Sequence, residues 1–570
     1  MTDLIPSPYS GEPSYPPARG QVAAGWNALA SALPPGVSIV AVDGPAIAAW
    51  PDVVSGLSSA LTASGRGVKC QGTAEWMRPW PYIREATSSR ALRDDPDFDK
   101  LADGDLADLF DLPGQLDAAD GVLVVYGPGA ALLPHDVLCY ADLPKRYAEA
   151  AVNDGSGLNL GQPPGSGPGT TKRLFYADWP LLDRHRDRIA GRIDWWIDMQ
   201  TPESPAVLSG AVLRDTLADL AARPFRVRPT FNTTPWGGHW AQRRLGQSTE
   251  ARNTALGYEL IAPESGILIG DPDGPRAEIP LQLAVTLHPR QVLGDTVHEV
   301  FGTSFPVRFD YLDTVGGGNL SVHCHPRPDY MREMFGWPYP QHETYYLMVG
   351  GDHNQVFLGL RADADPAAFH RAASDAGARG TEFAITRYVQ TFPATPHQLF
   401  LIPAGTPHGS GEGNVVLEIS ATPYLYSLRF YDWLRRDADG RQRPVHVTHA
   451  FRNLDVDRRG QAVPRDLVPE PRPLRDGDGW REELLGALPE MFFEVRRVVL
   501  ESGAVIGDDT AGRFHILNVV DGDGAVLETA GGRSHPLAYA ETLLVPASVG
   551  SYVLRPRGRH RVRIVKALVR

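Results

Sequence analysis

The chain has 570 residues, of which 42% are hydrophobic and 22% are charged, a balance typical of soluble globular proteins. A chain of this length predicts about two to four domains. Its formal net charge of -13 creates a field that repels phosphate backbones and anionic lipids. Neither nucleic acid nor a membrane surface is therefore an expected partner.

The three cysteines, Cys70, Cys139 and Cys324, lack the paired spacing of a disulfide framework or a zinc ribbon. No apolar run reaches the length of a membrane span. Residues 1–20 form a Pro-rich tail without the basic and apolar segments of a signal peptide. Together these features predict a protein of the reducing cytoplasm.

Residues 21–222 are expected to form an α/β domain with a parallel sheet, because strand-like runs alternate with helical stretches. The expected strands lie within 36–49, 121–127, 136–144 and 172–179, and a helix is expected over 181–199. Residues 153–171 are rich in Gly, Pro and Ser, which predicts a flexible insertion.

The first of these strands, VSIVAVDG, resembles the start of a P-loop kinase domain. A phosphate-binding loop needs the pattern GxxxxGK[ST], because the second Gly lets backbone N–H groups close around phosphate and the Lys neutralises its charge. Counted from Gly44, the last three positions hold Ala49, Trp50 and Pro51, and Pro51 has no backbone N–H. We expect a kinase-like βαβ domain with a degenerate P-loop.

Residues 223–475 have short apolar runs separated by Gly and Pro turns, which predicts an antiparallel β domain of sandwich or barrel type. Residues 476–570 follow the same pattern, with NVVDGDGAVLE as a hairpin candidate. The segment FLIPAGTPHGS (400–410) is echoed by LLVPASVGSYV (543–553), which places Ser551 opposite His408. The expected fold class is thus multidomain α/β plus β, with two related β domains of which only the first keeps ligand-type residues.

The segment LSVHCH (320–325) carries two histidines two residues apart. In a strand, alternate side chains share a face, so Ser321, His323 and His325 point one way and Cys324 packs on the other. Two imidazoles on one face can bind a single cation, although two solvated histidines on a surface strand would give the same pattern.

Two later segments complete a recognisable constellation. The strand ETYYLMV opens with Glu343, and the turn PAGTPHGS delivers His408 at the edge of a hairpin. The order His-x-His, Glu, then Pro-x-Gly-x-x-His is the cupin metal pattern, so we predict a jelly-roll β-barrel with a metal site. Imidazole and carboxylate ligands suit Zn²⁺, and also Mn, Fe, Co or Ni.

The segments GGGNLSVHCHP, HETYYLMVGGDHNQVFLGLR, LFLIPAGTPHGSG and VVLEISATPYLYSLRFYDW resemble class I mannose-6-phosphate isomerases, and the likeness covers roughly residues 223–570. The resemblance implies an isomerase of phosphorylated hexoses with Zn²⁺ bound by His323, His325, Glu343 and His408. It also implies Ser321 as a site serine and Arg429 as the catalytic arginine, offset by one residue from the family spacing.

Two positions depart from the family pattern. His323 replaces a metal-binding Gln, and Gln341 replaces a Lys, which removes a cation from the substrate pocket. Substrate contacts are expected from Ser321, Gln341 and Arg361, with Arg327 and Arg332 as further candidates to hold phosphate. Solvated surface arginines are an equally good interpretation of these three.

The expected reaction is aldose–ketose interconversion through an enediolate, whose charge the metal and Arg429 would stabilise. The proton-shuttling base is left open between a metal-bound water and a pocket acid. His446 and His449 could line the pocket, although loop histidines are more often structural. The alternatives are a metal-dependent oxygenase and a non-catalytic sugar-sensing protein.

Overall fold

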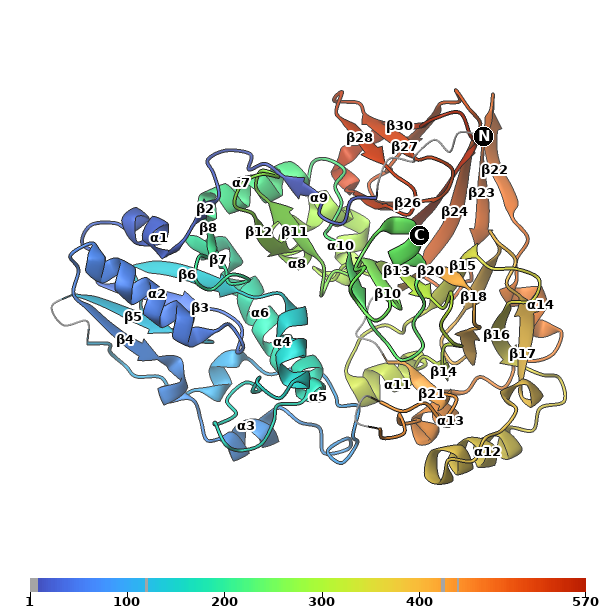
Figure 1. Ribbon diagram of the computed structural model, residues 1–570, viewed down its shortest axis with the longest axis horizontal. Helices are drawn as coiled ribbons and strands as arrows, with labels where there is room; N and C mark the ends of the chain where they lie inside the picture. Colours follow the sequence, from blue (N-terminus) through green and yellow to red (C-terminus); the bar gives the residue numbers. More distant parts are fainter. Residues whose placement is uncertain (1–8, 118–120, 422–425, 438–439) are drawn as a thin grey trace.

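The computed structural model describes residues 9–117, 121–421, 426–437 and 440–570. The molecule is elongated, with an α/β unit at one end and two β units at the other (Figure 1). The first eight residues of the expected Pro-rich tail lie outside the described ranges. The rest of that tail lies against the body of the protein, where β1 (Ser14–Tyr15) pairs in parallel with β11 (Gly266–Ile269).

The N-terminal unit is built on one sheet, whose central strands β4, β5, β3, β6 and β7 run parallel. This confirms the expected parallel sheet. In spatial order the strands are β2 (Ala23–Ala24), β8 (Ala206–Ser209), β7 (Trp195–Asp198), β6 (Val137–Asp142), β3 (Ile39–Asp43), β5 (Val122–Tyr126) and β4 (Val68–Gly72).

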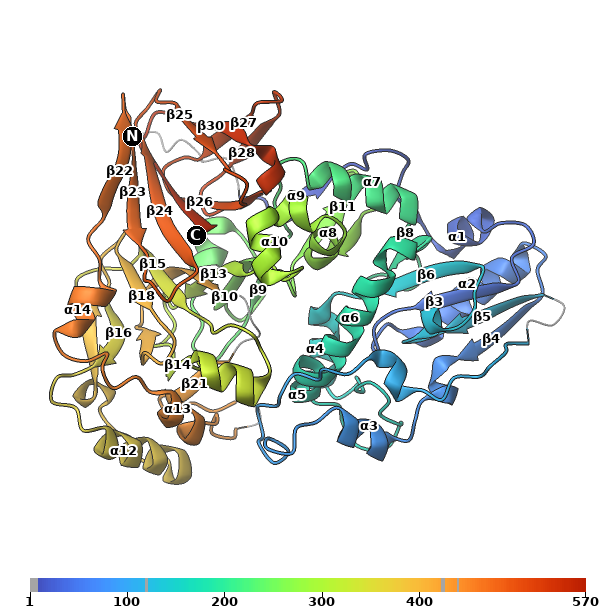
Figure 2. The same cartoon turned by 180° about the vertical axis from the view of Figure 1, so that it is seen from behind.

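Helices cover both faces of this sheet, as the view from behind also shows (Figure 2). Val40 and Val42 pack in one apolar cluster with α1 and α2, whereas Ala41 packs in another cluster with α6 and α7. Strands buried on both faces need apolar residues throughout, which explains their unbroken hydrophobic runs. The helices are α1 (Trp26–Ala32), α2 (Trp50–Ala63), α3 (Trp80–Ala86), α4 (Lys145–Asn153), α5 (Thr171–Arg173), α6 (Trp179–Ile189) and α7 (Gly210–Leu220).

The strand expected at 172–179 is wrong, and the helix expected over 181–199 is too long. The Thr170 side chain accepts the backbone N–H of Arg173 and so caps a helical stretch that continues through α6. The chain then enters the sheet as β7, where Trp196 and Ile197 are fully buried. Large aromatic and β-branched side chains favour a strand there despite the helical sequence before them.

The expected insertion 153–171 lies within the described residues. Asn159 is buried in it and donates to the Asp178 carboxylate (2.8 Å) and to the backbone oxygen of Thr170 (3.2 Å). Between the α/β and β units lies a small sheet of β1, β11 and β12 (Ala277–Pro280), followed by three helices. These are α8 (Leu281–Leu287), α9 (Pro289–Leu293) and α10 (Asp295–Phe301).

The first β unit is a sandwich of a long and a short sheet. The long sheet has the order β18 (Leu399–Ile402), β15 (Glu343–Val349), β20 (Val415–Ala421), β13 (Val307–Asp313), β10 (Leu256–Leu260), β9 (Thr230–Asn232). The short sheet has the order β17 (Val389–Pro393), β16 (Gln355–Leu360), β19 (His408–Ser410), β14 (Val322–Cys324), β21 (Leu428–Tyr431). Helices α11 (Pro328–Tyr330), α12 (Pro366–Arg379), α13 (Val447–Asn453) and α14 (Ala462–Leu467) flank it. Within the described ranges no strand ladder joins the two sheets, so the expected barrel is an open sandwich.

The second β unit repeats the strand order of the long sheet and, in the described residues, that of the short sheet without a counterpart of β21. Its long sheet runs β29 (Thr542–Val545), β26 (His515–Asp521), β31 (Val562–Val569), β24 (Phe493–Leu500), β23 (Trp480–Gly486), β22 (Arg472–Gly477). In the direction used for the first unit, its short sheet runs β28 (Ser534–Leu537), β27 (Ala525–Thr529), β30 (Ser551–Pro556), β25 (Ile506–Asp509). In both units the first strand of the echoed segment (β18, β29) edges the long sheet and the second (β19, β30) lies inside the short one, which confirms two related β folds.

The hairpin expected at NVVDGDGAVLE is wrong, because β26 belongs to the long sheet and β27 to the short one. Gly522 and Gly524 have positive φ values of 91° and 126°. Both lie close to neighbouring backbone, where a side chain would clash. The turn therefore carries the chain from one sheet to the other instead of folding it back on itself.

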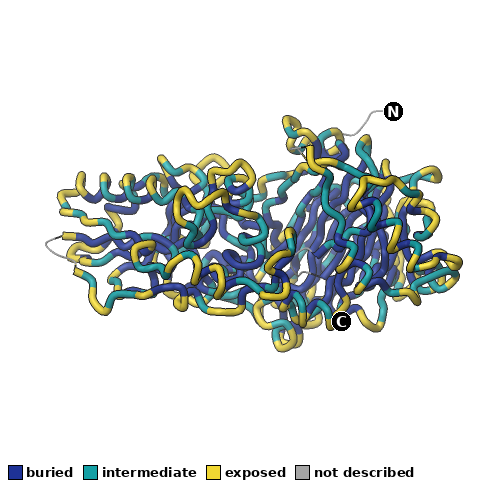
Figure 3. Tube along the Cα trace, turned by 90° about the horizontal axis from the view of Figure 1, so that it is seen from below, coloured by how far each residue is buried: buried dark blue, intermediate teal, exposed yellow. Residues whose placement is uncertain are grey.

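Buried backbone runs through both ends of the molecule, with exposed residues in turns and outer helices (Figure 3). A single apolar cluster extends from the N-terminal sheet into both β units. The two long sheets meet at Tyr311, whose hydroxyl donates to the backbone oxygen of Ala540 (2.7 Å) and accepts from Asn518 Nδ2 (2.6 Å). Among the helices of the described residues, none combines the length and apolarity needed to cross a bilayer.

We expect Tyr311→Phe to weaken the contact between the β units, because the Ala540 oxygen loses the Tyr311 hydroxyl as its donor and Asn518 Nδ2 keeps only Thr542 Oγ1 as an acceptor. The expected loss is about 1–3 kcal/mol of unfolding free energy. Urea unfolding followed by tryptophan fluorescence should show an earlier transition than in the wild type. Tyr82→Phe, at an exposed tyrosine of the N-terminal unit, is the control and should unfold like the wild type.

Candidate metal centre

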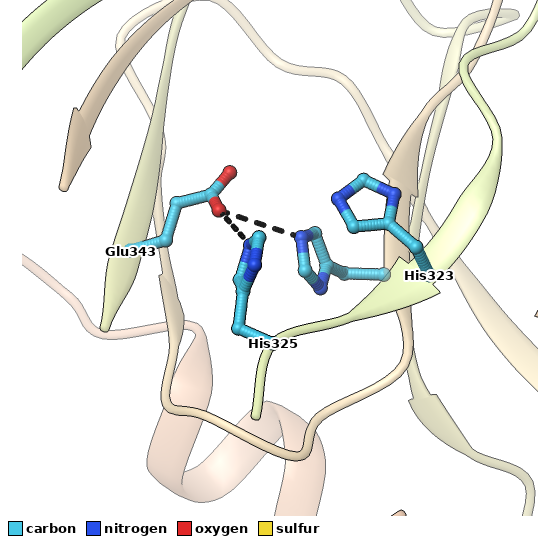
Figure 4. Close-up of side chains that lie close together, drawn as sticks. His323, His325 and Glu343 are labelled. Atoms are coloured by element: carbon cyan, nitrogen blue, oxygen red, sulfur yellow. Dashed lines mark hydrogen bonds and ion pairs between the residues drawn. The ribbon is translucent and has the colours of Figure 1, made fainter. Parts of the chain in front are cut away.

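Four side chains from the two sheets of the first β unit converge inside the sandwich. His323 and His325 come from β14 and the residue after its end, His408 opens β19, and Glu343 opens β15 on the facing sheet. One ligand atom from each lies within 4.8 Å of all the others. Figure 4 shows Glu343 entering from the side opposite His323 and His325. The structure therefore brings together the four residues that the sequence predicted as ligands.

Each imidazole is oriented by a backbone carbonyl. The Nδ1 atoms of His323, His325 and His408 lie 3.0, 3.2 and 2.9 Å from the backbone oxygens of Ser321, Tyr426 and Thr406. Carbonyl oxygens only accept, so in all three rings Nδ1 carries the proton. The Nε2 atoms then present lone pairs, which is the arrangement that metal-binding histidines need.

The lone pairs meet a carboxylate. Glu343 Oε2 contacts His325 Nε2 and lies 3.6 Å from His408 Nε2. Burial lowers the pKa values of His323 and His325, so both rings are neutral at pH 7. Buried acceptor atoms packed against each other in this way are unfavourable, and the four residues could hold a metal ion.

The donor set fits a divalent ion. All four residues are buried, and neither His408 Nε2 nor Glu343 Oε1 has a hydrogen-bond partner among the described residues. Buried polar atoms without partners are costly unless a ligand satisfies them. Three imidazoles and one carboxylate are a common set for Zn²⁺ and similar ions.

A second polar layer beside the centre was missed by sequence reasoning. Arg308 and Asp310 on β13 pair in register with Ser420 and Glu418 on β20, and Ser420 pairs with Glu343. The Arg308 side chain donates to Ser420 Oγ (2.7 Å) and to Glu418, and all of these residues are buried. Charged residues at alternate positions of two otherwise apolar strands were the available signal.

The other predicted site residues lie at different depths. Ser321 is buried, and its backbone oxygen holds His323. Gln341 is fully buried, and its amide has no hydrogen-bond partner in the described part of the chain. Arg361 is exposed and lies 3.2 Å from Asp363. Cys324 is buried in an apolar cluster, as expected from the strand alternation.

Arg429 lies on β21, directly opposite His323 on β14. Opposed residues of an antiparallel pair leave the sheet on the same face, so the arginine side chain starts beside a proposed ligand. Its Nη2 lies 3.2 Å from His446 Nε2, and burial lowers the pKa of the guanidinium from its usual value.

The second β unit shows what replaces the cluster there. His323 pairs with His408 in the first unit, and the matching pair in the second is Asp509 with Ser551. Ser551 Oγ donates to Asp509 Oδ2 (2.6 Å). Lys566 takes the place that Glu418 has in the first unit, and its Nζ lies 2.5 Å from both Glu482 and Asp508. These groups pair with one another, and among the described residues no group of three or more potential metal ligands lies in the second unit.

We expect one divalent ion per chain in protein purified without chelator, measured by inductively coupled plasma mass spectrometry. His325→Ala removes one ligand. It should lower the bound metal by about 10-fold or more, because changing a residue that only orients a ligand already lowers metal affinity by about that factor. His353→Ala, at an exposed histidine of the same unit, is the matched control. Equal metal content in the two variants would rule out the centre.

Residues 25–222 match a protein-family model described as a domain of unknown function (DUF8485). The chain is 24% identical over 336 residues to the mannose-6-phosphate isomerase of Streptococcus mutans, a match that covers 58% of this chain and 95% of that protein. It is 23% identical over 344 residues to mannose-6-phosphate isomerase ManA of Bacillus subtilis, covering 59% and 96%.

Two of the similar solved structures cover a comparable share of the chain. The mannose 6-phosphate isomerase of Bacillus subtilis covers 60% of this chain and 99% of its own, at 19% identity and a TM-score of 0.49. A putative mannosephosphate isomerase from Archaeoglobus fulgidus covers 61% and 98%, at 18% identity and a TM-score of 0.46. The expected sequence relationship to mannose-6-phosphate isomerases is thus confirmed over 58–59% of the chain, and the kinase-like character of the N-terminal unit stays a prediction.

Proposed function

We propose that the chain is a metal-dependent aldose–ketose isomerase that interconverts mannose 6-phosphate and fructose 6-phosphate. The observation that carries the proposal is the convergence of three oriented Nε2 lone pairs and the Glu343 carboxylate. The sequence similarity adds support, because it extends over 95–96% of the length of two relatives named as mannose-6-phosphate isomerases.

Zn²⁺ is the proposed ion, held by His323, His325, Glu343 and His408. When bound, a divalent cation would polarise the sugar oxygens at C1 and C2 and favour their negatively charged forms. The sugar would then lie near the polar layer of Arg308, Asp310 and Glu418, which is next to Glu343 on the long sheet.

Isomerisation moves a proton from C2 to C1 and another from O2 to O1, so a group near the sugar must take and return protons. Glu418 is the acid that the geometry favours, because it projects into the sandwich next to Ser420, the strand neighbour of Glu343. Burial raises the pKa of Glu418 to about 7, which suits a group that works in both directions. Arg429 would stabilise the charge of the enediolate.

Substrate contacts are inferred from a buried amide without a partner among the described residues and from an exposed guanidinium. The Gln341 amide is buried without a partner among the described residues, so a sugar hydroxyl would supply the hydrogen bonds it lacks. The Ser321 hydroxyl lies 3.4 Å from His323 Nδ1, at the edge of the centre. Arg361 is the proposed phosphate contact, because its exposed guanidinium can exchange Asp363 for a phosphate group.

We expect the purified protein to convert mannose 6-phosphate to fructose 6-phosphate in a coupled assay. Prolonged chelation should abolish the activity, and added Zn²⁺ should restore it, because the ion carries the developing charge. His325→Ala should stay inactive after Zn²⁺ is added, whereas His353→Ala should recover. Full activity of metal-free protein would end the proposal.

We expect Glu418→Gln to lower kcat by about 10²–10⁴-fold, because the amide cannot take a proton from C2. The isosteric amide keeps the packing near Arg308, and metal content should stay unchanged because Glu418 is not among the four donors. Incorporation of solvent deuterium at C2 should fall with kcat. Glu412→Gln, at an exposed glutamate before β20, is the control. Deuterium incorporation at the wild-type rate in Glu418→Gln would assign the proton transfer to another group.

A further inference from the structure

One segment of the N-terminal unit lies on the first β unit, close to Arg429. This docking segment, residues 92–101, follows α3 and reaches the region of α11 and α13 in both views (Figures 1 and 2). At its end the Leu101 backbone N–H donates to the backbone oxygen of Phe335 (3.0 Å). Segments far apart in sequence are thereby joined beside the candidate metal centre.

The docking segment is held in a defined conformation. Asp95 Oδ1 accepts the backbone N–H groups of Asp97 (2.9 Å) and Phe98 (2.7 Å), which fixes a turn. Asp95 Oδ2 lies 2.8 Å from His449 Nε2 on α13. Lys172 donates to the Asp95 backbone oxygen (2.6 Å) and so ties the turn to the body of the N-terminal unit.

Phe98 is the apolar anchor of the segment. It is buried, and its ring centre lies 4.6 Å from that of His446 and 6.0 Å from that of Tyr426. The Tyr426 backbone oxygen is the group that orients His325. The segment therefore packs against residues that touch both Arg429 and a proposed metal ligand.

His446 links the docking segment to Arg429. His446 Nδ1 lies 3.0 Å from the Arg429 backbone nitrogen and 3.1 Å from the Ser427 backbone oxygen. The Arg429 N–H has a fixed direction and donates to Nδ1, so we assign the ring proton to Nε2. That Nε2–H points to Asp97 Oδ2, 3.1 Å away. The Arg429 guanidinium lies 3.2 Å from the same Nε2. Both of these groups are donors, and Asp97 accepts from the His446 Nε2–H.

The charged groups around Arg429 indicate an electrostatic role for Asp97. Arg443 is another cation close to Arg429, and Asp432 is already bonded to Arg435 (2.7 Å) and Arg443 (2.8 Å). The Asp97 carboxylate, which belongs to the N-terminal unit, adds negative charge on the side of His446. A contact that only joined the two units would not require a carboxylate next to His446 Nε2.

We propose that the N-terminal unit is a positioning element of the isomerase site, in which Asp97 holds Arg429 through His446. The inference rests on the proposed function for its catalytic part. Asp97 touches neither the four donors nor the polar layer of Arg308 and Glu418, so its loss should leave metal binding intact. It should lower kcat more than it changes KM, because Arg429 acts on the enediolate and not on the bound sugar.

The kinetic test uses the full-length, Zn²⁺-loaded chain. Asp97→Ala should lower kcat by about 10–100-fold, the effect of a small misplacement of a catalytic group. Asp97→Glu should recover part of it. On an Arg429→Gln background, Asp97→Ala should cause no further loss, because both changes remove the same interaction. Asp94→Ala, at an exposed residue of the docking segment, should behave like the wild type.

A second readout does not depend on activity. In protein labelled with ¹⁵N-histidine, the His446 Nε2–H should give a downfield proton signal, assigned by its loss in His446→Gln. This signal should vanish in Asp97→Ala and persist in Asp94→Ala. Its persistence in Asp97→Ala, or a wild-type kcat in that variant, overturns the inference. An inactive wild type ends the isomerase proposal and the catalytic part of this one, while the proton signal still decides the contact.

Discussion

The candidate site depends on three backbone carbonyls more than on any side-chain pair. Because the oxygens of Ser321, Tyr426 and Thr406 fix the Nδ1 protons, the three Nε2 lone pairs point to one place. Glu343 adds a carboxylate from the facing sheet. Four buried acceptors packed together are unfavourable on their own, and the cluster they form could hold a metal ion.

The two β units show how one strand order can hold different interiors. In the first, Glu418 and Asp310 lie near the metal donors and Arg308 partly neutralises them. In the second, Lys566 stands at the place of Glu418, with Glu482 and Asp508 as its partners. That ion network is complete, and breaking a buried network by removing one partner is costly. The second unit also packs against the first, through contacts such as Tyr311 with Asn518.

The ligand set was predictable because its signals are local: strand alternation places His323 and His325 on one face, and a turn motif places His408. Strand β15 was also predicted with its observed bounds, Glu343–Val349. Other features depend on distant partners. The hairpin at residues 518–528 failed because Gly522 and Gly524 respond to neighbouring backbone, and the 172–179 strand failed because a cap at Thr170 starts a helix. No pattern near Asp97 predicts its contact with His446, since 349 positions separate them.

The central claim is that one cation lies between the two sheets of the first β unit. Anomalous diffraction at the zinc edge from crystals grown with Zn²⁺ tests it directly. The expected result is one strong peak about 2.0–2.2 Å from the Nε2 atoms of His323, His325 and His408 and from a Glu343 oxygen. Zinc bound only elsewhere, with these four side chains closed on one another without an ion, would contradict it.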